Sequence, residues 1–181
     1  ADGIAIGAAG AGAFAIAAIP ARYALERGAW TEAAALPVRP ANTAYTEAMT
    51  HFARAIGAAR SGLPGAAAAD IARLAELRDL LQSRQDAYWT GQVDIQRRGA
   101  LAWVAFATVL KYQLHEHISR EILHVEPQQA NYYGRRDVGE FLRSILERGR
   151  TQDWRDLIRE TTGSEISARP MLEYFAPLTA E

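Results

Sequence analysis

The sequence predicts an all-α protein in which short helical hairpins continue into a C-terminal group of helices. Three observations indicate this class. Apolar residues recur at the helical period, glycines and prolines separate segments of helix length, and two turn glycines, Gly28 and Gly62, lie 34 residues apart. The apolar fraction of 49% allows a core of ordinary size. Because much of that fraction is alanine, we expect the core to depend on close approach of helices.

The first segment carries no charge from residue 3 to residue 21. A signal peptide would need a basic stretch before it, and a membrane span would need about 20 strongly apolar residues, whereas this segment is mostly glycine and alanine. We therefore expect a helix that packs inside the protein and ends at Pro20, and no membrane span.

A second interpretation of this segment is a dinucleotide site. Residues 10–15 fit the pattern G-x-G-x-x-A and follow the strand-like residues 4–6. Such a site also needs a βαβ unit with an acidic residue about 20 positions further on. The sequence continues instead into a helical turn, which favours small-residue helix packing and predicts no cofactor. A helix and a strand–turn–helix both remain open for this segment.

The next elements are separated by glycine and proline. A short helix is expected to end at Gly28, where a positive φ costs least, and another to run from Trp30 to Leu36. A longer helix is predicted over 43–60, with its apolar residues at helical spacing. Residues 61–65 form a predicted turn, and 66–81 return to helix. The apolar positions of the longer helix are Tyr45, Met49, Phe52 and Ile56.

The spacing of these units matches the tetratricopeptide period. Gly28 and Gly62 are 34 residues apart, and so are Ala33 and Ala67. Such a unit needs glycine at the turn and a small residue where its helices cross. Trp30 supplies the aromatic that packs beneath the first turn, whereas the second unit has a proline at that place. The alternative is a pair of alanine-rich hairpins with accidental spacing.

Residues 84–124 are predicted to form one or two helices, because Gly91 and Gly99 leave their continuity open. Three compact helices are then expected within 137–149, 151–163 and 167–177. The first opens with a capping box (an aspartate followed three residues later by a glutamate), the first two end at glycine, and the third has proline in its first turn. The four tryptophans of the chain are expected to anchor the core.

Residues from about 15 to 105 resemble a group of bacterial tetratricopeptide-repeat proteins. The stretches that carry this resemblance are Ile19-Pro20-Ala21-Arg22-Tyr23-Ala24-Leu25-Glu26-Arg27-Gly28, His51-Phe52-Ala53-Arg54-Ala55, Asp86-Ala87-Tyr88-Trp89 and Ala102-Trp103-Val104-Ala105. The resemblance implies a helical scaffold that binds protein partners and performs no chemistry.

Residues from about 107 to 178 are similar to the C-terminal region of bacterial peptidyl-dipeptidases of the angiotensin-converting-enzyme type. The stretches in order are Thr108-Val109-Leu110-Lys111-Tyr112-Gln113-Leu114-His115-Glu116-His117-Ile118, Asn131-Tyr132-Tyr133-Gly134, Val138-Gly139-Glu140-Phe141-Leu142, Asp153-Trp154-Arg155 and Met171-Leu172-Glu173-Tyr174-Phe175-Ala176-Pro177-Leu178. This resemblance covers only the end of a much longer family domain. One departure is Ala130, where family members often carry cysteine.

The resemblance implies no catalytic residue in this chain. The family works through a zinc-binding H-E-x-x-H helix, in which the two histidines share a face and the glutamate activates water. The chain has no such motif. His115 and His117 are two positions apart and are expected on different helix faces.

One histidine–carboxylate group does share a predicted helix face. His117, Glu121 and His124 lie at spacings of four and seven, so they are a candidate zinc site, against the alternative of a solvated polar stripe. A net charge of −1 gives no electrostatic reason to expect nucleic acid as a partner. If a partner surface exists, the candidates are Tyr45, Met49 and Phe52.

We therefore expect two segments, tetratricopeptide-like hairpins over 1–106 and a peptidyl-dipeptidase-like helical segment over 107–181. The leading functional hypothesis is a non-catalytic helical scaffold or protein-interaction module. The alternative is a fragment or relative of a zinc peptidyl-dipeptidase that lacks the H-E-x-x-H portion. Because the two segments resemble different families, a natural fusion and an artificial or chimeric chain both remain open. The compartment, bacterial cytoplasm or periplasm, and the oligomeric state also stay open.

Overall fold

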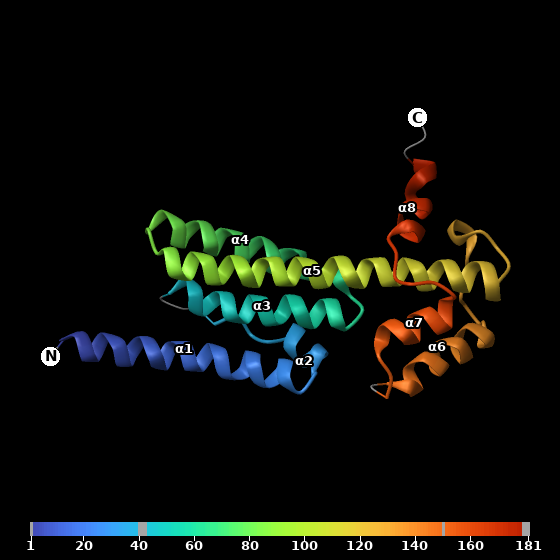
Figure 1. Cartoon of the computed structure of the whole chain (residues 1–181). Helices are drawn as coiled ribbons and strands as arrows, with labels where there is room; N and C mark the ends of the chain where they lie inside the picture. The colour runs from blue at the N-terminus through green and yellow to red at the C-terminus, as the bar shows by residue number, and fades with distance from the viewer. Residues whose placement is uncertain (1, 40–42, 150, 179–181) are drawn as a thin grey trace. The chain divides into compact units, whose positions relative to one another are not determined.

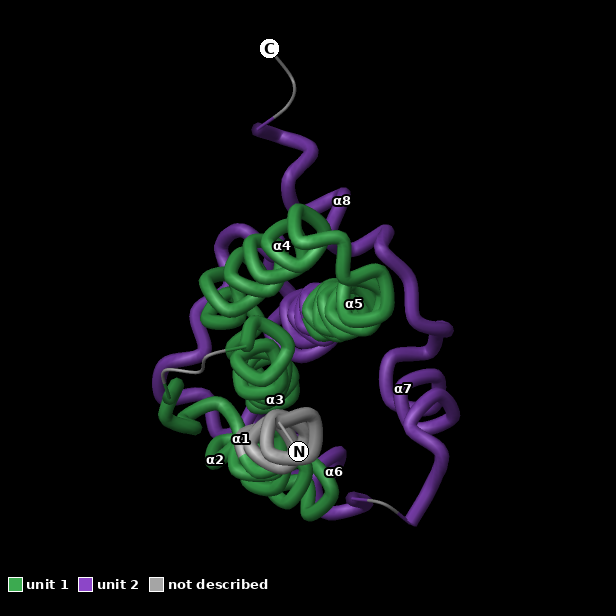
Figure 2. The backbone as a smooth tube through the Cα atoms, turned by 90° about the vertical axis from the view of Figure 1, so that its left-hand side faces the viewer, with its two compact units in different colours: residues 1–107 green, residues 108–181 purple. Residues whose placement is uncertain are grey.

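The computed structural model describes residues 2–39, 43–149 and 151–178, and throughout these ranges the chain forms helices, turns and loops without any strand. The predicted all-α class is therefore confirmed. The chain divides into two compact units, residues 1–107 and residues 108–181 (Figures 1 and 2). The boundary lies inside one long helix, α5.

The N-terminal unit is arranged around α3. Figure 2 shows α3 between α1 and α2 on one side and α4 and the first part of α5 on the other. A short 3₁₀ turn leads into α4. The helices are α1 (Asp2–Glu26), α2 (Trp30–Ala34), α3 (Ala44–Arg60), α4 (Ala68–Ser83) and α5 (Ala87–His117).

The glycine- and alanine-rich N-terminal segment is helical. Residues 4–6 lie within α1, so of the two conformations left open for this segment the helix is correct and the strand–turn–helix is wrong. The expected helix end at Pro20 is also wrong, because α1 continues to Glu26. Proline removes one helical hydrogen bond, but packing of Ala18, Ala21 and Ala24 on both sides of it keeps the helix in place. No helix in the described ranges is long and apolar enough to cross a membrane.

Both predicted turn glycines adopt the left-handed conformation. Gly28 has φ of 67° and Gly62 has φ of 80°. The helices around them begin and end close to the predicted places, at Glu26, Trp30 and Arg60. However, α2 is only five residues long. The first hairpin is therefore shorter than a full tetratricopeptide unit, and the repeat assignment stays a prediction.

The core of this unit is built on α3, whose buried side chains are mostly alanine. The closest approach is at Gly57. A Cβ atom placed there would lie 2.4 Å from the backbone nitrogen of Ala34, 2.6 Å from the carbonyl oxygen of Trp30 and 2.8 Å from Cβ of Ala33. The expectation that Ala33 marks a close helix crossing is therefore correct, and its partner at that crossing is Gly57.

The side chain of Arg60, at the end of α3, contacts tryptophan rings of two other helices. The guanidinium of Arg60 lies 4.0 Å from the ring centre of Trp30 and 4.4 Å from that of Trp103. Trp30 and Trp89 pack against the core as expected. Trp103 is 38% exposed and anchors this core less than expected, and Trp154, in the C-terminal unit, is 37% exposed.

A network of ion pairs connects α3 to α4. One carboxylate oxygen of Asp70 accepts hydrogen bonds from Nδ1 of His51 at 2.7 Å and from Nε of Arg54 at 2.9 Å. Arg54 also donates to the carbonyl of Leu36 at 2.8 Å, which ties down the loop after α2. Burial alone would raise the pKa of Asp70, but the hydrogen bonds from His51 and Arg54 outweigh it and hold the pKa below its usual value.

The candidate partner residues face α5. Tyr45 stacks on Trp89 with 4.0 Å between ring centres, and the sulfur of Met49 accepts a hydrogen bond from Gln96 at 3.2 Å. Phe52 lies beside Gly99, where an added Cβ would be 3.6 Å from its ring. All three side chains are only partly exposed. Most of their surface is thus covered by the chain itself.

The C-terminal unit begins in the last turns of α5. This helix runs without a break through Gly91 and Gly99, so the predicted segment 84–124 is one helix followed by a π-helical turn at Ile118–Ile122. The compact helices after it are α6 (Arg136–Arg148), α7 (Trp154–Thr162) and α8 (Arg169–Phe175).

In α6 and α7 of the C-terminal unit, the sequence predicts the last residue of the helix better than the first. Gly149 and Gly163 end α6 and α7 with φ of 50° and 75°. The predicted capping box is absent, because Asp137 already lies inside α6 and its carboxylate binds Arg135. Helix α7 is capped by Asp153, whose side chain accepts from the backbone N–H of Arg155 at 2.8 Å. The sequence placed the start of this helix two residues earlier, at Thr151.

Substitution Gly57→Ala is expected to destabilise the N-terminal unit by about 1–3 kcal/mol or more, because the new methyl group pushes α2 away from α3. Gly91→Ala is the control, since an added Cβ at Gly91 meets nothing within 4 Å. In a helix interior that change should stabilise by about 0.5–1 kcal/mol. Urea unfolding followed by circular dichroism measures both. Equal midpoints for the two variants would contradict the close crossing.

Acid should weaken the contact between α3 and α4. Because the folded-state pKa of Asp70 is depressed, its stabilising contribution is present above the unfolded-state value of about 3.9 and is lost as pH falls below it. Asp70→Asn should lower stability at pH 7 by roughly 1–3 kcal/mol and reduce the loss between pH 5 and pH 2. Asp79→Asn, at an exposed position of α4, should leave the loss of stability between pH 5 and pH 2 unchanged. The same unchanged loss in Asp70→Asn would refute this account.

Candidate functional site

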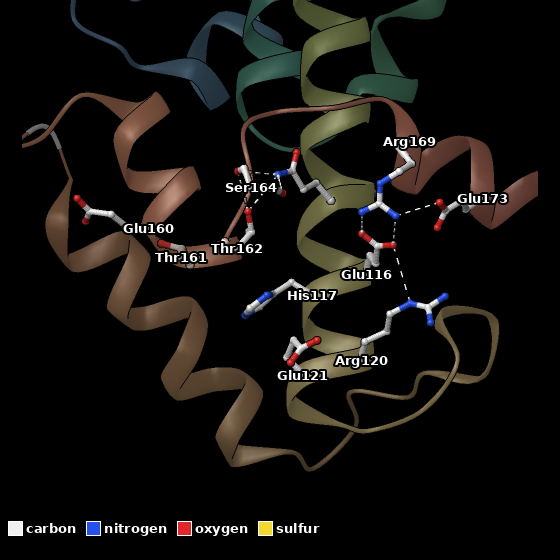
Figure 3. Close-up of a pocket in the computed structure, with 12 residues that line it drawn as sticks. Glu116, His117, Arg120, Glu121, Glu160, Thr161, Thr162, Ser164, Arg169 and Glu173 are labelled. Atoms are coloured by element: carbon white, nitrogen blue, oxygen red, sulfur yellow. Dashed lines mark hydrogen bonds and ion pairs between the residues drawn. The ribbon is translucent and has the colours of Figure 1, made fainter.

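The candidate site is a polar pocket of about 700 Å³ in the C-terminal unit. Three segments line it: the end of α5 with the π turn, the end of α7 with the loop after it, and α8 (Figure 3). Ionised groups dominate the lining. They are Glu116, Arg120, Glu121, Glu160, Arg169 and Glu173.

Gln113 fixes one wall of the pocket. Its side chain is buried, and its amide nitrogen lies 3.0 Å from Oγ1 of Thr162, 3.1 Å from Oγ of Ser164 and 3.1 Å from the carbonyl of Glu165. Its amide oxygen accepts from the backbone N–H of Ser167 at 3.0 Å. One side chain of α5 therefore holds the whole connection between α7 and α8.

Ion pairs hold the opposite wall. The guanidinium of Arg169 lies 2.9 Å from Glu173 and 3.3 Å from Glu116 (Figure 3). The hydrogen bond that Arg169 donates to Glu173 and the charge of Glu116 raise the pKa of Arg169. Arg120 lies 3.9 Å from Glu116 and 3.2 Å from Glu126. Both arginines are thus paired with carboxylates, and the pocket has more acidic than basic groups.

The predicted histidine–carboxylate group is separated by the π turn. His117 and Glu121 line the pocket, and the His117 ring stacks on Phe141 with 5.1 Å between ring centres. His124 lies beyond the helix with φ of 55°, and its Nδ1 is 3.1 Å from the carbonyl of Arg120. Within the described ranges, no three histidine, aspartate or glutamate side chains are grouped so that they could hold a metal ion. The spacing of four and seven assumed a regular α-helix, which ends at His117.

His115 lies on another face of the helix, as its spacing from His117 predicts. Its Nε2 is 2.8 Å from the carbonyl oxygen of Pro127 and therefore donates to it. Nδ1 consequently accepts from the hydroxyl of Tyr132. Both ring nitrogens hold the loop after the π turn, so His115 has a structural role.

The two threonine hydroxyl groups in the pocket are engaged by the backbone. Thr161 donates to the carbonyl of Leu157 at 2.6 Å, and Thr162 donates to that of Ile158 at 2.9 Å. Their protons therefore satisfy the end of α7 and are not shared with His117 as they would be in a nucleophile–base pair. Hydrogen bonds and ion pairs thus hold the walls of this pocket.

Comparison with known proteins finds similarity in this part of the chain. A family model described as angiotensin-converting enzyme matches residues 92–180. Bovine (Bos taurus) angiotensin-converting enzyme is 36% identical over 73 residues, which are 39% of this chain and 6% of that protein. The mouse (Mus musculus) angiotensin-converting enzyme-like protein Ace3 is 38% identical over 72 residues, 39% of this chain and 10% of that protein. No solved structure matches.

These findings support the peptidyl-dipeptidase resemblance, and the family model extends it further upstream. The family match begins at residue 92, inside α5 and upstream of the expected start near residue 107. Part of the segment assigned to the tetratricopeptide-like region thus also matches this family. The matched part spans no more than a tenth of the length of the relatives described above.

Gln113→Leu should destabilise the C-terminal unit by at least about 2 kcal/mol, because several buried donors and acceptors lose their partner. Gln128→Leu is the matched control, since Gln128 is exposed and its side chain donates to the carbonyl of Tyr174 at the surface. Hydrogen exchange of residues 162–167 should become faster in the first variant only. Unchanged exchange there would show that Gln113 does not hold the connection.

Proposed function

We propose that the C-terminal part of this chain is a relative of the C-terminal segment of angiotensin-converting-enzyme-type peptidases. In this proposal it acts as a non-catalytic structural segment, and peptidase activity requires a zinc-bearing helical region in addition. The family match over residues 92–180 is the observation that carries the proposal. The histidines of the chain stand at 51, 115, 117 and 124, so no pair has the spacing of H-E-x-x-H.

The pocket supports the structural role. Its buried amide, Gln113, and its ion-paired arginine, Arg169, both connect segments that are far apart in the sequence. Such contacts fix the shape of a helical wall, and they leave none of these groups poised for acid–base chemistry. In a longer peptidase domain, this wall would support a catalytic centre located elsewhere.

The first test measures the chain alone. With added zinc we expect no release of dipeptides from the C-terminus of a peptide substrate and no shift of the melting temperature. Release that depends on zinc and stops with a chelator would overturn the non-catalytic assignment, and His117 and Glu121 would then be the first residues to substitute.

A graft tests the structural role directly. The C-terminal part of this chain that is similar to bovine angiotensin-converting enzyme over 73 residues would replace that segment of the bovine enzyme. We expect the graft to retain zinc-dependent dipeptide release, and Gln113→Leu within it to reduce that activity together with thermal stability. The control graft carries Gln128→Leu and should behave like the unsubstituted graft. A folded but inactive graft would contradict the proposal.

A second candidate function concerns the N-terminal unit, which we propose to be a helical protein-interaction scaffold. The observation in its favour is that Gly28 and Gly62, 34 residues apart, both adopt a positive φ. Because Tyr45, Met49 and Phe52 are packed against α5, a partner would bind another face of this unit.

A further inference from the structure

Helix α1 is apolar on two opposite faces. Its inner face carries Ala18, Ala21 and Ala24, which are 5%, 2% and 0% exposed. Its outer face carries Ile16 and Ile19, which are 57% and 66% exposed. A helix that is apolar all round is normally buried all round, whereas the described part of the chain leaves Ile16 and Ile19 of the outer face uncovered.

The outer face forms a continuous stripe. Gly12, Ile16, Ile19 and Tyr23 follow one another at spacings of four, three and four, which keeps them on one side of a helix. Tyr23 is 58% exposed, and the guanidinium of Arg27 lies 4.6 Å from its ring centre. Gly12 is exposed, and an added Cβ there would meet nothing within 4 Å. We call these four residues the α1 stripe.

We infer that the α1 stripe binds the same stripe of a second copy of the chain, with the two helices antiparallel. The spacings of four, three and four residues within the α1 stripe are the same when the helix is followed in either direction. An antiparallel pair therefore places Ile16 opposite Ile19 of the second copy and Gly12 opposite Tyr23 of the second copy. The small residue thus faces the largest one, and each bulky aliphatic residue faces the other.

Electrostatics also favour a second copy of the chain as the partner of the α1 stripe. No charged residue occurs between residues 3 and 21, so two copies meet without like-charge repulsion along this stretch. The antiparallel arrangement also sets the positive end of each helix dipole beside the negative end of the other. A charged protein surface would have to be desolvated against this uncharged stripe, which costs free energy.

The length of the α1 stripe predicts a weak dimer. A stable interface buries roughly 800 Å² on each partner, more than four side chains provide. The α1 stripe spans residues 12–23 and, at 1.5 Å per residue, is about 17 Å long. The pair therefore belongs to the small interfaces that dissociate on dilution.

The test measures the mass of the full chain by sedimentation equilibrium between 1 and 100 μM. We expect a dimer that dissociates on dilution, and Ile16→Glu and Ile19→Glu should each weaken it at least about tenfold, since a carboxylate would be buried unpaired. Leu63→Glu is the matched control, because Leu63 is 64% exposed and lies in a turn outside α1. It should leave the dimer intact. Circular dichroism confirms that all variants are folded.

A monomer at every concentration would overturn the inference, and so would a dimer that survives both glutamate substitutions. Binding of the chain to phosphatidylcholine vesicles, lost in Ile19→Glu, would replace the second copy by a lipid surface and would also overturn it.

Orientation is tested by cross-linking, which the absence of cysteine makes simple. A mixture of Gly12→Cys and Tyr23→Cys chains should form a mixed disulfide faster than either chain forms one with itself. Preferential self-linking of each chain would indicate parallel helices and contradict the antiparallel pair.

Discussion

The contact of α2 with α3 at Gly57 is the constraint on which the N-terminal unit depends. Alanine and glycine bury little apolar area, so an alanine-rich core gains enough free energy only when helix backbones come close together. An added Cβ at Gly57 would lie 2.4 Å from a backbone atom of Ala34, which leaves no room for adjustment without separating the helices. Arg54, which pairs with Asp70 on α4, also ties α3 to the loop after α2 through its hydrogen bond to the carbonyl of Leu36.

The C-terminal unit is stabilised in a different way. Its helices are short, and several of its large apolar residues, such as Leu146 and Leu172, are exposed. Long-range polar contacts connect its parts instead: Gln113 binds the connection before α8, and Arg169 binds Glu116 on α5. Buried hydrogen bonds of this kind are costly to break, because the remaining partner is left unsatisfied. This pattern is expected of a segment that completes a larger helical domain, as the proposed function requires.

The sequence predicted the features that are set locally. The turns at Gly28, Gly62 and Gly163 require a positive φ, and glycine supplies it in each case. Features that depend on contacts distant in the sequence were missed. Gln113 gave no distinct signal, because Lys111, His115 and Glu116 near it are polar as well, and its partners lie about 50 residues away. The grouping of His117, Glu121 and His124 failed as a helix face, because the period argument assumed an α-helix where a π turn intervenes.

Hydrogen exchange measured by mass spectrometry in increasing denaturant tests the central claim that the two units are stabilised separately. The account predicts that amides of α3 open only with the whole N-terminal unit, and that residues 162–167 open in a second transition with its own denaturant midpoint. Substitution at Gly57 should move only the first midpoint, and substitution at Gln113 only the second. A single transition for both segments, or one that shifts as a whole with either substitution, would contradict the account.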